Sequence, residues 1–361
     1  MLTEVERDQL TGGYPYQLEK VGGGFQGCHW RLKCRGGTYF VKAQQEGSYD
    51  TGAFVKEPMV YGQLLPAMGY HIGEKRLWPR LYFARKGLLV LEDLAAGGWV
   101  LEETFGTEHV KASLSALADF HASSMLLDDA VPVSENFRDA LLETYFTPPA
   151  LRTWEAFKRT ARKIYTKYFP CRKWEEALRM MDETPEMVRP STKFRNCVCH
   201  GDPWPNNIFF KYTNGVPVKA CFVDFAQVRY CLPASDVLLF LRLLQVDDID
   251  GYLLFYHSCL AANVPSFTLK EFLDSCVEMN PFALCVAPLY VYLTRLPQVV
   301  IERISKSPEE FMEFAMGKDA PALEAMEEDQ RYRSSVIRTF KELLDFASKD
   351  KTDEDKLLIR K

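Results

Sequence analysis

The pattern of hydrophobic and polar positions divides the chain into a strand-rich first part and a largely helical remainder. In the first part, runs with the composition of β-strands occupy residues 28–34 and 38–43, and a second pair occupies residues 81–84 and 88–91. A short glycine-containing turn separates the members of each pair, which predicts two β-hairpins. Between the hairpins, apolar residues of the segment 52–68 recur at helical spacing and predict a helix.

After residue 94 the pattern becomes mostly helical, with apolar residues recurring on one face of each segment. A turn signal, Thr213-Asn214-Gly215, interrupts this pattern and predicts a third hairpin. The predicted elements of this part are helices within 107–125, 136–187 and 236–347, and strands over 208–212 and 218–223. We therefore predict an α+β chain with a small β-rich domain, residues 1–94, followed by a larger and mainly helical domain, residues 95–361.

Composition narrows the classes of function. The 361 residues are 47% hydrophobic and 26% charged, which is typical of a globular enzyme with a core large enough for two domains and a cleft. The 44 basic and 49 acidic residues give a net charge of -5, which argues against a general nucleic-acid partner. The longest apolar stretch, residues 282–293, contains Pro288 and is too short to span a membrane, so no membrane partner is expected.

The N-terminal residues and the cysteines indicate a cytoplasmic protein. Residues 1–10 are polar and acidic, without the apolar run of a signal peptide, so we expect the ten cysteines to be reduced. Cys197, Cys199 and His200 have a spacing that begins some metal sites, but no second ligand pair follows them. A zinc site is therefore not favoured over buried thiols.

The strongest chemical signal lies in His200-Gly201-Asp202-Pro203-Trp204-Pro205-Asn206-Asn207, followed seventeen residues later by Asp224. The spacing of His200, Asp202 and Asn207 matches the catalytic loop H-x-D-x-x-x-x-N of protein kinases. The predicted hairpin after this loop returns the chain and brings Asp224 beside it. Asn207 and Asp224 then offer the oxygen ligands that Mg²⁺ prefers, and Asp202 is placed to accept the proton of a hydroxyl group.

The first part of the chain supplies the other groups that phosphoryl transfer requires. Lys42, on the second predicted strand, is expected to neutralise nucleotide phosphates, and Glu57, on the predicted helix, to hold that lysine. Glycines allow backbone N–H groups to approach phosphates closely, and a joint between domains can present backbone groups to adenine. The candidate phosphate loop contains Gly22, Gly23, Gly24 and Gly27, and the candidate hinge contains Leu91, Glu92, Asp93 and Leu94.

Each of these features has an ordinary structural interpretation when it is taken alone. A glycine cluster is usually a turn, a strand lysine is usually at the surface, and His121, on an apolar helix face, is better explained as a buried core residue. Their order along the chain is what favours chemistry: glycine loop, strand lysine, helix glutamate, hinge, catalytic loop and metal-binding aspartate. This order predicts an enzyme with a bilobal protein-kinase-like fold and with ATP and Mg²⁺ as cofactors.

At these motifs the sequence resembles the ecdysteroid kinase-like (CHK kinase-like) family, which is related to choline kinases and aminoglycoside phosphotransferases. The His-Gly-Asp-x-Trp-x-Asn-Asn element from His200 to Asn207 carries most of this resemblance. Further matches are Phe40-Val41-Lys42, Glu57 with Tyr61 and Leu64-Leu65-Pro66, Leu91-Glu92-Asp93-Leu94, Leu117-Ala118 with His121-Ala122, Asp224-Phe225 with Arg229-Tyr230, Pro233-Ala234, and Asp236.

The resemblance implies Asp202 as catalytic base, Asn207 and Asp224 as magnesium ligands, and Lys42 with Glu57 as the phosphate-binding pair. It also implies that Asp236 has a structural role at the start of a helix. Three residues depart from the family pattern without removing a required oxygen or charge. They are Pro203 and Pro205, on either side of Trp204, and Ala226 before Gln227; in addition, no proline follows Phe40-Val41-Lys42.

The sequence indicates a small-molecule acceptor rather than a protein. Only residues 225–235 separate Asp224 from Asp236, which leaves no room for the activation segment of a protein kinase. The family resemblance suggests a steroid-like, xenobiotic or glycoside alcohol and indicates no obligate protein partner. Two alternatives remain open: a phosphotransferase of the choline, ethanolamine or aminoglycoside type, and a pseudokinase that binds a nucleotide without turnover.

Overall fold

The structure is a computed structural model in which the chain forms two compact units. It describes residues 2–22, 27–44, 51–69 and 75–348. The first unit consists of Met1–Thr144, His200–Arg229 and Ala262–Val264, and the second of Tyr145–Cys199, Tyr230–Ala261 and Pro265–Lys361. The predicted domain boundary after residue 94 falls inside the first unit, and the division into domains 1–94 and 95–361 stays a prediction.

A five-stranded antiparallel sheet begins the first unit, in the strand order β1-β2-β3-β5-β4. The strands are β1 (Tyr16–Val21), β2 (Gly27–Cys34), β3 (Gly37–Gln44), β4 (Leu81–Arg85) and β5 (Leu88–Glu92). Both hairpins predicted in this part are present, as the pairs β2–β3 and β4–β5. The central strand β3 carries Lys42, which lies opposite His29 on one side and Leu89 on the other.

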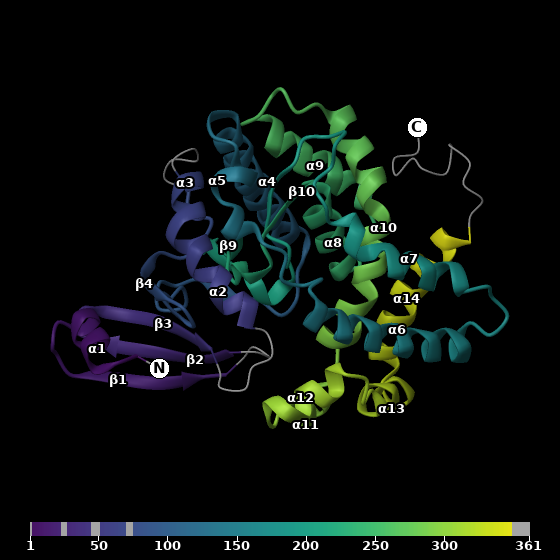
Figure 1. The fold of residues 1–361 in the computed structure, drawn as a ribbon, viewed down its shortest axis with the longest axis horizontal. Coiled ribbons are helices and arrows are strands. Elements are labelled where there is room, and N and C mark those ends of the chain that lie inside the picture. The colour runs from purple at the N-terminus through teal and green to yellow at the C-terminus, as the bar shows by residue number, and fades with distance from the viewer. Residues whose placement is uncertain (1, 23–26, 45–50, 70–74, 349–361) are drawn as a thin grey trace. The chain divides into compact units, whose positions relative to one another are not determined.

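One face of this sheet is closed by a helix that the hydrophobic pattern did not predict. Helix α1 (Glu4–Thr11) begins with a capping box in which the side chain of Thr3 accepts from the backbone of Glu6. Leu2 and Leu10, which flank or lie on this helix, pack with Val41 and other core residues of the sheet. Figure 1 shows α1 beside the ends of the purple strands. The alternation of the strands therefore buries this face and turns Lys42 to the opposite one.

The helical segment that carries Glu57 packs against β3 and β5. The segment 52–68, predicted as one helix, consists of α2 (Thr51–Met59), the π-helical turn η1 (Val60–Leu64) and α3 (Leu65–Gly69). Pro58, inside α2, has no N–H group for the carbonyl of Phe54. That carbonyl accepts instead from the backbone N–H of Gly87, at 3.2 Å, in the turn between β4 and β5. The carbonyl that Pro58 leaves without a donor in the helix thus bonds the helix to the sheet.

A second, three-stranded antiparallel sheet of the first unit holds the loop with the predicted catalytic residues. Its strands are β6 (Val100–Leu101), β8 (Ile208–Thr213) and β9 (Val216–Phe222), in the order β6-β8-β9. The predicted turn joins β8 to β9, and its central residues Asn214 and Gly215 both have positive φ, as a tight two-residue hairpin requires. Helix α4 (Thr107–Ala130), predicted over 107–125, packs against β9 and buries His121 as expected.

Short helical elements complete the first unit. They are α5 (Val133–Asn136) and three 3₁₀ turns: η2 (Arg138–Leu141), η3 (Pro205–Asn207) and η4 (Phe225–Gln227). Helix α2 packs against both η2 and η4. The helix with Glu57 is therefore in contact with the turn that directly follows Asp224.

The second unit is mainly helical, as predicted from the segments 136–187 and 236–347. Its helices are α6 (Pro148–Tyr168), α7 (Glu175–Met187), α8 (Ala234–Leu244), α9 (Ile249–Ala261), α10 (Leu269–Thr294), α11 (Gln298–Ile304), α12 (Pro308–Ala315), α13 (Ala320–Glu328) and α14 (Gln330–Ala347). Two three-residue strands that were not predicted, β7 (Cys197–Cys199) and β10 (Arg229–Cys231), pair with each other.

The long helix α10 is the centre of the second unit. It packs against α7, α8 and α14, and it continues through Pro281 and Pro288. By length and composition alone it is apolar enough to cross a membrane, but 67% of its most apolar window is buried inside the protein. The buried guanidinium of Arg242 in α8 donates to Asn280 in α10 at 2.6 Å. These contacts are those of a core helix.

Candidate functional site

Lys42 and Glu57 form an ion pair beneath the five-stranded sheet. The Nζ atom of Lys42 on β3 lies 2.8 Å from Oε2 of Glu57 on α2, and the glutamate side chain is 1% exposed. Residues 41 and 43 fill the core on the other face of the strand, so the register of the sheet directs Lys42 toward the helix. The predicted pair is therefore formed, although its two members are fifteen residues apart in the sequence.

Asp224 lies at the same lysine. Its Oδ1 atom is 2.8 Å from Nζ of Lys42, and its side chain is 41% exposed, so the carboxylate also faces solvent. Its backbone has φ 64° and ψ 69°, in the left-handed region, which is uncommon for residues other than glycine although aspartate adopts it more often than most. Such a conformation is retained only where the surrounding structure fixes it, and it is enriched at functional sites.

The predicted catalytic loop folds around the side chain of Asn207. The Nδ2 atom of Asn207 donates to the backbone oxygen and to Oδ2 of Asp202, at 3.0 Å in each case. Because both bonds involve the amide nitrogen, they fix the orientation of the amide and turn Oδ1 away from Asp202. The backbone N–H of Val223 donates to the carbonyl of Asn207 at 2.9 Å, which brings the residue before Asp224 to this loop.

His200 connects the catalytic loop to Val223, the residue that follows β9. Its Nε2 atom lies 3.0 Å from the carbonyl oxygen of Val223, and its Nδ1 atom lies 3.2 Å from the backbone nitrogen of Asp202. A carbonyl can only accept, so Nε2 carries the proton, and Nδ1 is the acceptor for the N–H of Asp202. The ring is fully buried, and the geometry gives it the role of holding the loop in place.

The two carboxyl groups at Lys42 have different pKa values because Glu57 is buried and Asp224 is partly exposed. Burial acts to lower the pKa of Lys42, but the attraction of Asp224 and Glu57 outweighs it and raises that pKa above its ordinary value. Burial acts to raise the pKa of Asp224, but the attraction of Lys42 prevails and lowers it. Burial raises the pKa of Glu57 to about 7, against the attraction of Lys42. The partly exposed carboxylate of Asp224 therefore ionises more readily than the buried carboxylate of Glu57.

The candidate hinge forms a closed turn after β5. Leu91 and Leu94 are buried, and the carbonyl of Leu94 accepts from Trp99 at 3.0 Å. The carboxylate of Asp93 pairs with Arg31 of β2. This turn is held by the ion pair of Asp93 with β2 and by the backbone bond between Trp99 and Leu94, which suits a joint that presents its backbone to a ligand.

Glu92, the last residue of β5, is fixed in the same way. Its Oε1 atom lies 2.6 Å from Arg76, and its Oε2 atom accepts from the backbone of Arg80 at 3.2 Å. In the candidate phosphate loop, Gly22 follows β1 and Gly27 begins β2. Gly23 and Gly24 lie outside the described residues, so the glycine loop stays a prediction.

The departures from the family pattern occupy defined places in the loop region. Pro203 is buried, and Pro205 is the first residue of the turn η3, a position that suits proline because its missing N–H is not needed there. Ala226 lies in η4, and its carbonyl accepts from Oγ1 of Thr144 at 3.0 Å. The extra residue after Asp224-Phe225 therefore takes part in a contact within the first unit.

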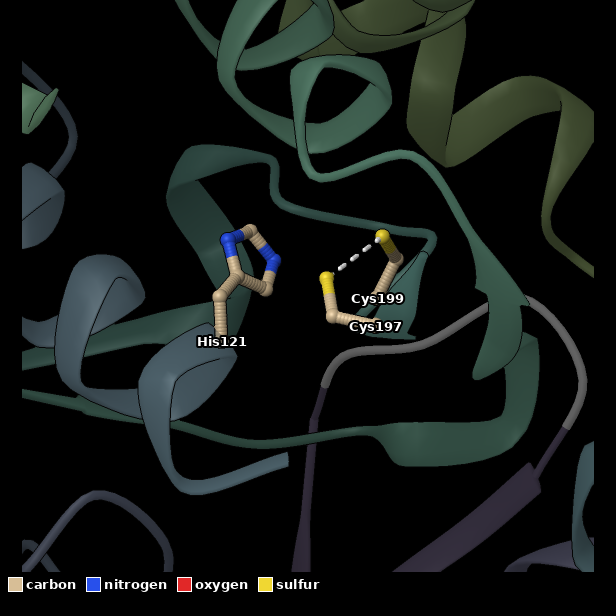
Figure 2. A group of neighbouring side chains, drawn as sticks. All are labelled: His121, Cys197 and Cys199. Carbon is tan, nitrogen blue, oxygen red and sulfur yellow. Dashed lines mark hydrogen bonds between the residues drawn. The ribbon is translucent and has the colours of Figure 1, made fainter. Parts of the chain in front are cut away.

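The cysteines of β7, Cys197 and Cys199, are buried free thiols. Figure 2 shows the sulfur atoms of Cys197 and Cys199 facing each other, at 3.7 Å. Burial raises the pKa of both thiols, which disfavours the thiolate form that binds metals. His200 has both ring nitrogens engaged within the first unit, so the sequence spacing does not correspond to a ligand set.

Sequence reasoning missed two residues that shape this site. Gly201 has φ +80°, and a Cβ atom on it would lie 2.1 Å from the carbonyl oxygen of Gln227. Lys56, the residue before Glu57, is 2% exposed although a lysine on a helix is ordinarily at the surface. The glycine in the motif was a usable signal, whereas nothing in the sequence distinguishes Lys56 from a surface lysine.

Comparisons with known proteins find a matching family and similar folds. A sequence profile of the ecdysteroid kinase-like family matches residues 38–267, which is more than half of the chain and includes Lys42, Glu57, Asp202, Asn207 and Asp224. The chain belongs to the ecdysteroid kinase-like family. No curated protein matches it significantly in a direct search.

Three solved structures similar to this ecdysteroid kinase-like protein have low sequence identity to it. A Ralstonia eutropha protein provisionally named an aminoglycoside phosphotransferase is 14% identical, with a TM-score of 0.50 over 91% of this chain and 93% of its own. A spectinomycin phosphotransferase, solved with ADP and spectinomycin, is 12% identical with a TM-score of 0.49 over 88% and 98%. A Plasmodium vivax ethanolamine kinase is 13% identical with a TM-score of 0.44 over 89% and 84%.

The family and the fold class predicted from the sequence are confirmed. The ecdysteroid kinase-like protein has an α+β protein-kinase-like fold, with an N-terminal antiparallel sheet followed by a largely helical region. The structure brings Lys42, Glu57 and Asp224 together and joins Asn207 to Asp202. The roles assigned to these residues and to the glycine loop and hinge stay predictions.

Proposed function

We propose that this protein is a small-molecule kinase that uses ATP and Mg²⁺ to phosphorylate a hydroxyl group of a small organic alcohol. The observation that carries the proposal is the double contact of Lys42 with Glu57 and Asp224, both at 2.8 Å. A lysine held by a buried glutamate, next to an aspartate suited to a metal ion, is the arrangement that phosphoryl transfer requires. Membership of the ecdysteroid kinase-like family supports the same class of reaction.

Two oxygens of the site fit a magnesium ion. The Oδ1 atom of Asn207 is turned away from Asp202 by the two bonds of its amide nitrogen, and the carboxylate of Asp224 is ionised and partly exposed. Mg²⁺ is commonly bound by one or two protein oxygens, with water and phosphate completing its shell. When bound, the ion supplies positive charge next to the phosphate oxygens.

The remaining residues have separate tasks in this proposal. Lys42, whose pKa is raised, carries a positive charge at neutral pH and binds phosphate oxygens, and Glu57 holds its side chain in place. Asp202 accepts the proton of the acceptor hydroxyl, and Asn207 fixes its carboxylate at 3.0 Å. His200 holds the backbone of Asp202 through an N–H bond of 3.2 Å. General base catalysis of this kind contributes on the order of 10²- to 10⁴-fold to the rate.

A small-molecule acceptor is supported by the short connection after Asp224. Residues 225–233 lead directly from Asp224 to α8, and they contain one 3₁₀ turn and a three-residue strand. This length leaves no room for the segment on which protein kinases bind a peptide. The family suggests a steroid-like, xenobiotic or glycoside alcohol, and the similar structures suggest aminoglycosides or ethanolamine as further compounds to test.

The experiment measures ATP consumption across a library of alcohols that includes sterols, glycosides, choline, ethanolamine and aminoglycosides, with and without Mg²⁺. We expect one class to stimulate turnover by the wild type. Asp202→Ala should lower turnover on the order of 10²- to 10⁴-fold while the protein still binds ATP, because proton acceptance is lost together with one of the two bonds that orient the amide of Asn207. Asp224→Ala should abolish the response to Mg²⁺ and leave the protein folded.

The matched control is Asp247→Ala. Asp247 is 97% exposed and lies in the second unit, so its removal should leave turnover unchanged. A wild type that binds ATP but is stimulated by no acceptor would support the pseudokinase alternative. Undiminished Mg²⁺-dependent turnover in Asp224→Ala would contradict the metal assignment.

A further inference from the structure

Lys56 is a buried lysine whose ammonium group holds two backbone carbonyls. It precedes Glu57 on α2, and its side chain is 2% exposed. Its Nζ atom donates to the carbonyl of Leu142, at 2.6 Å, and to the carbonyl of Val228. Leu142 follows η2, and Val228 follows η4, the turn after Asp224. One ammonium group therefore connects the helix of Glu57 with two other segments of the first unit.

The two segments that Lys56 holds are also joined to each other. The hydroxyl of Thr144 donates to the carbonyl of Ala226 at 3.0 Å. The guanidinium of Arg229 pairs with Glu143, with 3.2 Å between Nε and Oε2. Residues 142–144 are thus connected to residues 226–229 by a hydroxyl and by an ion pair, and Lys56 lies between them. We name this set of contacts the Lys56 clamp.

A charged group in this position needs an explanation. Removing an ammonium ion from water is costly unless its hydrogen bonds are replaced, and helix surfaces normally leave lysines in solvent. The cost is acceptable where the group fixes a geometry that the protein uses. Consecutive residues of an α-helix point about 100° apart, so fixing the side chain of Lys56 also fixes the rotation of α2 about its axis. Glu57, on the same turn, is then fixed as well.

The helix has a particular need for such an anchor. Pro58 removes one hydrogen bond from α2, and a π-helical turn begins at Val60. The carbonyl of Phe54, which Pro58 frees, is bonded to Gly87 of the sheet. The bond between Phe54 and Gly87 therefore connects α2 to the sheet, and the Lys56 clamp connects α2 to the segment after Asp224.

We propose that Lys56 is a positioning residue for phosphoryl transfer, which acts by holding Glu57 and the segment after Asp224 in place. This role rests on the proposed kinase function. In this proposal the contacts of Lys42 with Glu57 and Asp224 are formed permanently, without the activation segment that protein kinases use to assemble them. In this role Lys56 acts through the carbonyls of Leu142 and Val228, and not by binding the nucleotide or the acceptor.

The test is a double-mutant cycle between Lys56→Met and Glu57→Gln, in which kcat is measured with Mg·ATP. The acceptor is the best alcohol of the library, or water where only ATP hydrolysis is measured. Methionine keeps the length of the side chain and removes the charge. We expect Lys56→Met to lower kcat on the order of tenfold to a hundredfold, because small displacements of a catalytic group have effects of this size. In the Glu57→Gln background, the further loss should be about twofold or less, since residues that act together are not additive.

Thr144→Val provides a second variant if Lys56→Met fails to fold. It loosens residues 142–144 without leaving an unpaired charge, and its loss of kcat should also shrink in the Glu57→Gln background. The matched control is Lys163→Met. Lys163→Met loses the ion pair between Lys163 and Asp319 in the second unit, whose atoms are 2.8 Å apart. The variant should therefore have a lower unfolding midpoint and an unchanged kcat.

The outcomes separate the two proposals. The positioning role alone would be overturned if the wild type is active and Lys56→Met lowers kcat by the same factor in the wild-type and Glu57→Gln backgrounds. An unchanged kcat in a folded Lys56→Met protein would overturn it as well. For Thr144→Val, an unchanged kcat or an equal loss in both backgrounds would overturn the role in the same way. Absence of turnover by the wild type, with any acceptor and with water, would overturn the kinase proposal and this role with it.

Discussion

Gly201, between His200 and Asp202, offers the most direct test of how the catalytic loop is held. Its backbone has φ +80°, and an added Cβ would lie 2.1 Å from the carbonyl oxygen of Gln227 and 2.8 Å from the carbonyl carbon. Both atoms belong to the backbone of the turn after Asp224, so no side-chain rotation can relieve the overlap. Gly201→Ala therefore has to separate the catalytic loop from that turn.

The size of the separation follows from the contact distance. Ordinary van der Waals contact begins at 3.4 Å, so the gap between Gly201 and Gln227 has to open by about 1.3 Å. The left-handed conformation alone costs an alanine about 1–2 kcal/mol. A displacement of about 1 Å at a catalytic group lowers rates on the order of a hundredfold. We therefore expect Gly201→Ala to lower kcat by about this factor, in addition to a loss of stability.

The assay compares Gly201→Ala with Gly215→Ala. Gly215 has nearly the same backbone, φ +76°, but no atom lies within 4 Å of its added Cβ. In urea unfolding both variants should lose stability from the backbone conformation, and Gly201→Ala should lose more because of the overlap with Gln227. Only Gly201→Ala should lose kcat in the Mg·ATP assay. Equal kcat values in the two variants would refute the close approach of the loop and the turn as a condition for activity.

Three further changes test the charges of the site. For Glu57, the folded pKa of about 7 exceeds the unfolded value of 4.5, so the free energy of unfolding of the wild type should fall as pH rises between these values. Measured by urea unfolding at pH 5 and 8, Glu57→Gln should remove up to about 3 kcal/mol of this fall. The same fall in the wild type and in Glu57→Gln would contradict the raised pKa. For Asp224, whose pKa Lys42 lowers, the sign is opposite: stability present above the unfolded pKa is lost as pH falls through the folded one, and Asp224→Asn should flatten this acid limb. Asn207→Asp places a carboxylate 3.0 Å from Asp202, so the acid limb of the pH–rate profile should move to higher pH; an unmoved limb would exclude coupling of the two groups.

Much of the fold followed from local sequence patterns. The turn Thr213-Asn214-Gly215 specifies a hairpin because Asn214 and Gly215 tolerate positive φ. That hairpin brings Asp224 back to the catalytic loop, so the convergence of these residues could be predicted from spacing alone. The alternation of side chains along β3 likewise explains why Lys42 faces away from the core formed by Val41 and Ala43.

Other elements gave weaker signals. Helix α1 has a capping box, Thr3 to Glu6, which is readable in the sequence, but its few apolar residues suggested only a polar start. Strand β1 is exposed along most of its length, so it lacks the alternation of a half-buried strand. The strands β7 and β10 have three residues each, too few for a periodic pattern. Lys56 is buried by contacts with residues 142 and 228, and these depend on the tertiary structure.

Asp224 shows why the site required both kinds of information. The sequence specifies a carboxylate at this position, but its left-handed backbone, φ 64°, is unfavourable for a residue with a side chain. The conformation persists because both neighbouring segments are held: the N–H and the carbonyl of Val223 bond to Asn207 and His200, and Lys56 binds the carbonyl of Val228. Strain of this kind is maintained by the surrounding structure, and here it directs the carboxylate to Lys42 and to solvent. The contacts of the two neighbouring segments therefore determine where the ionised group of the site lies.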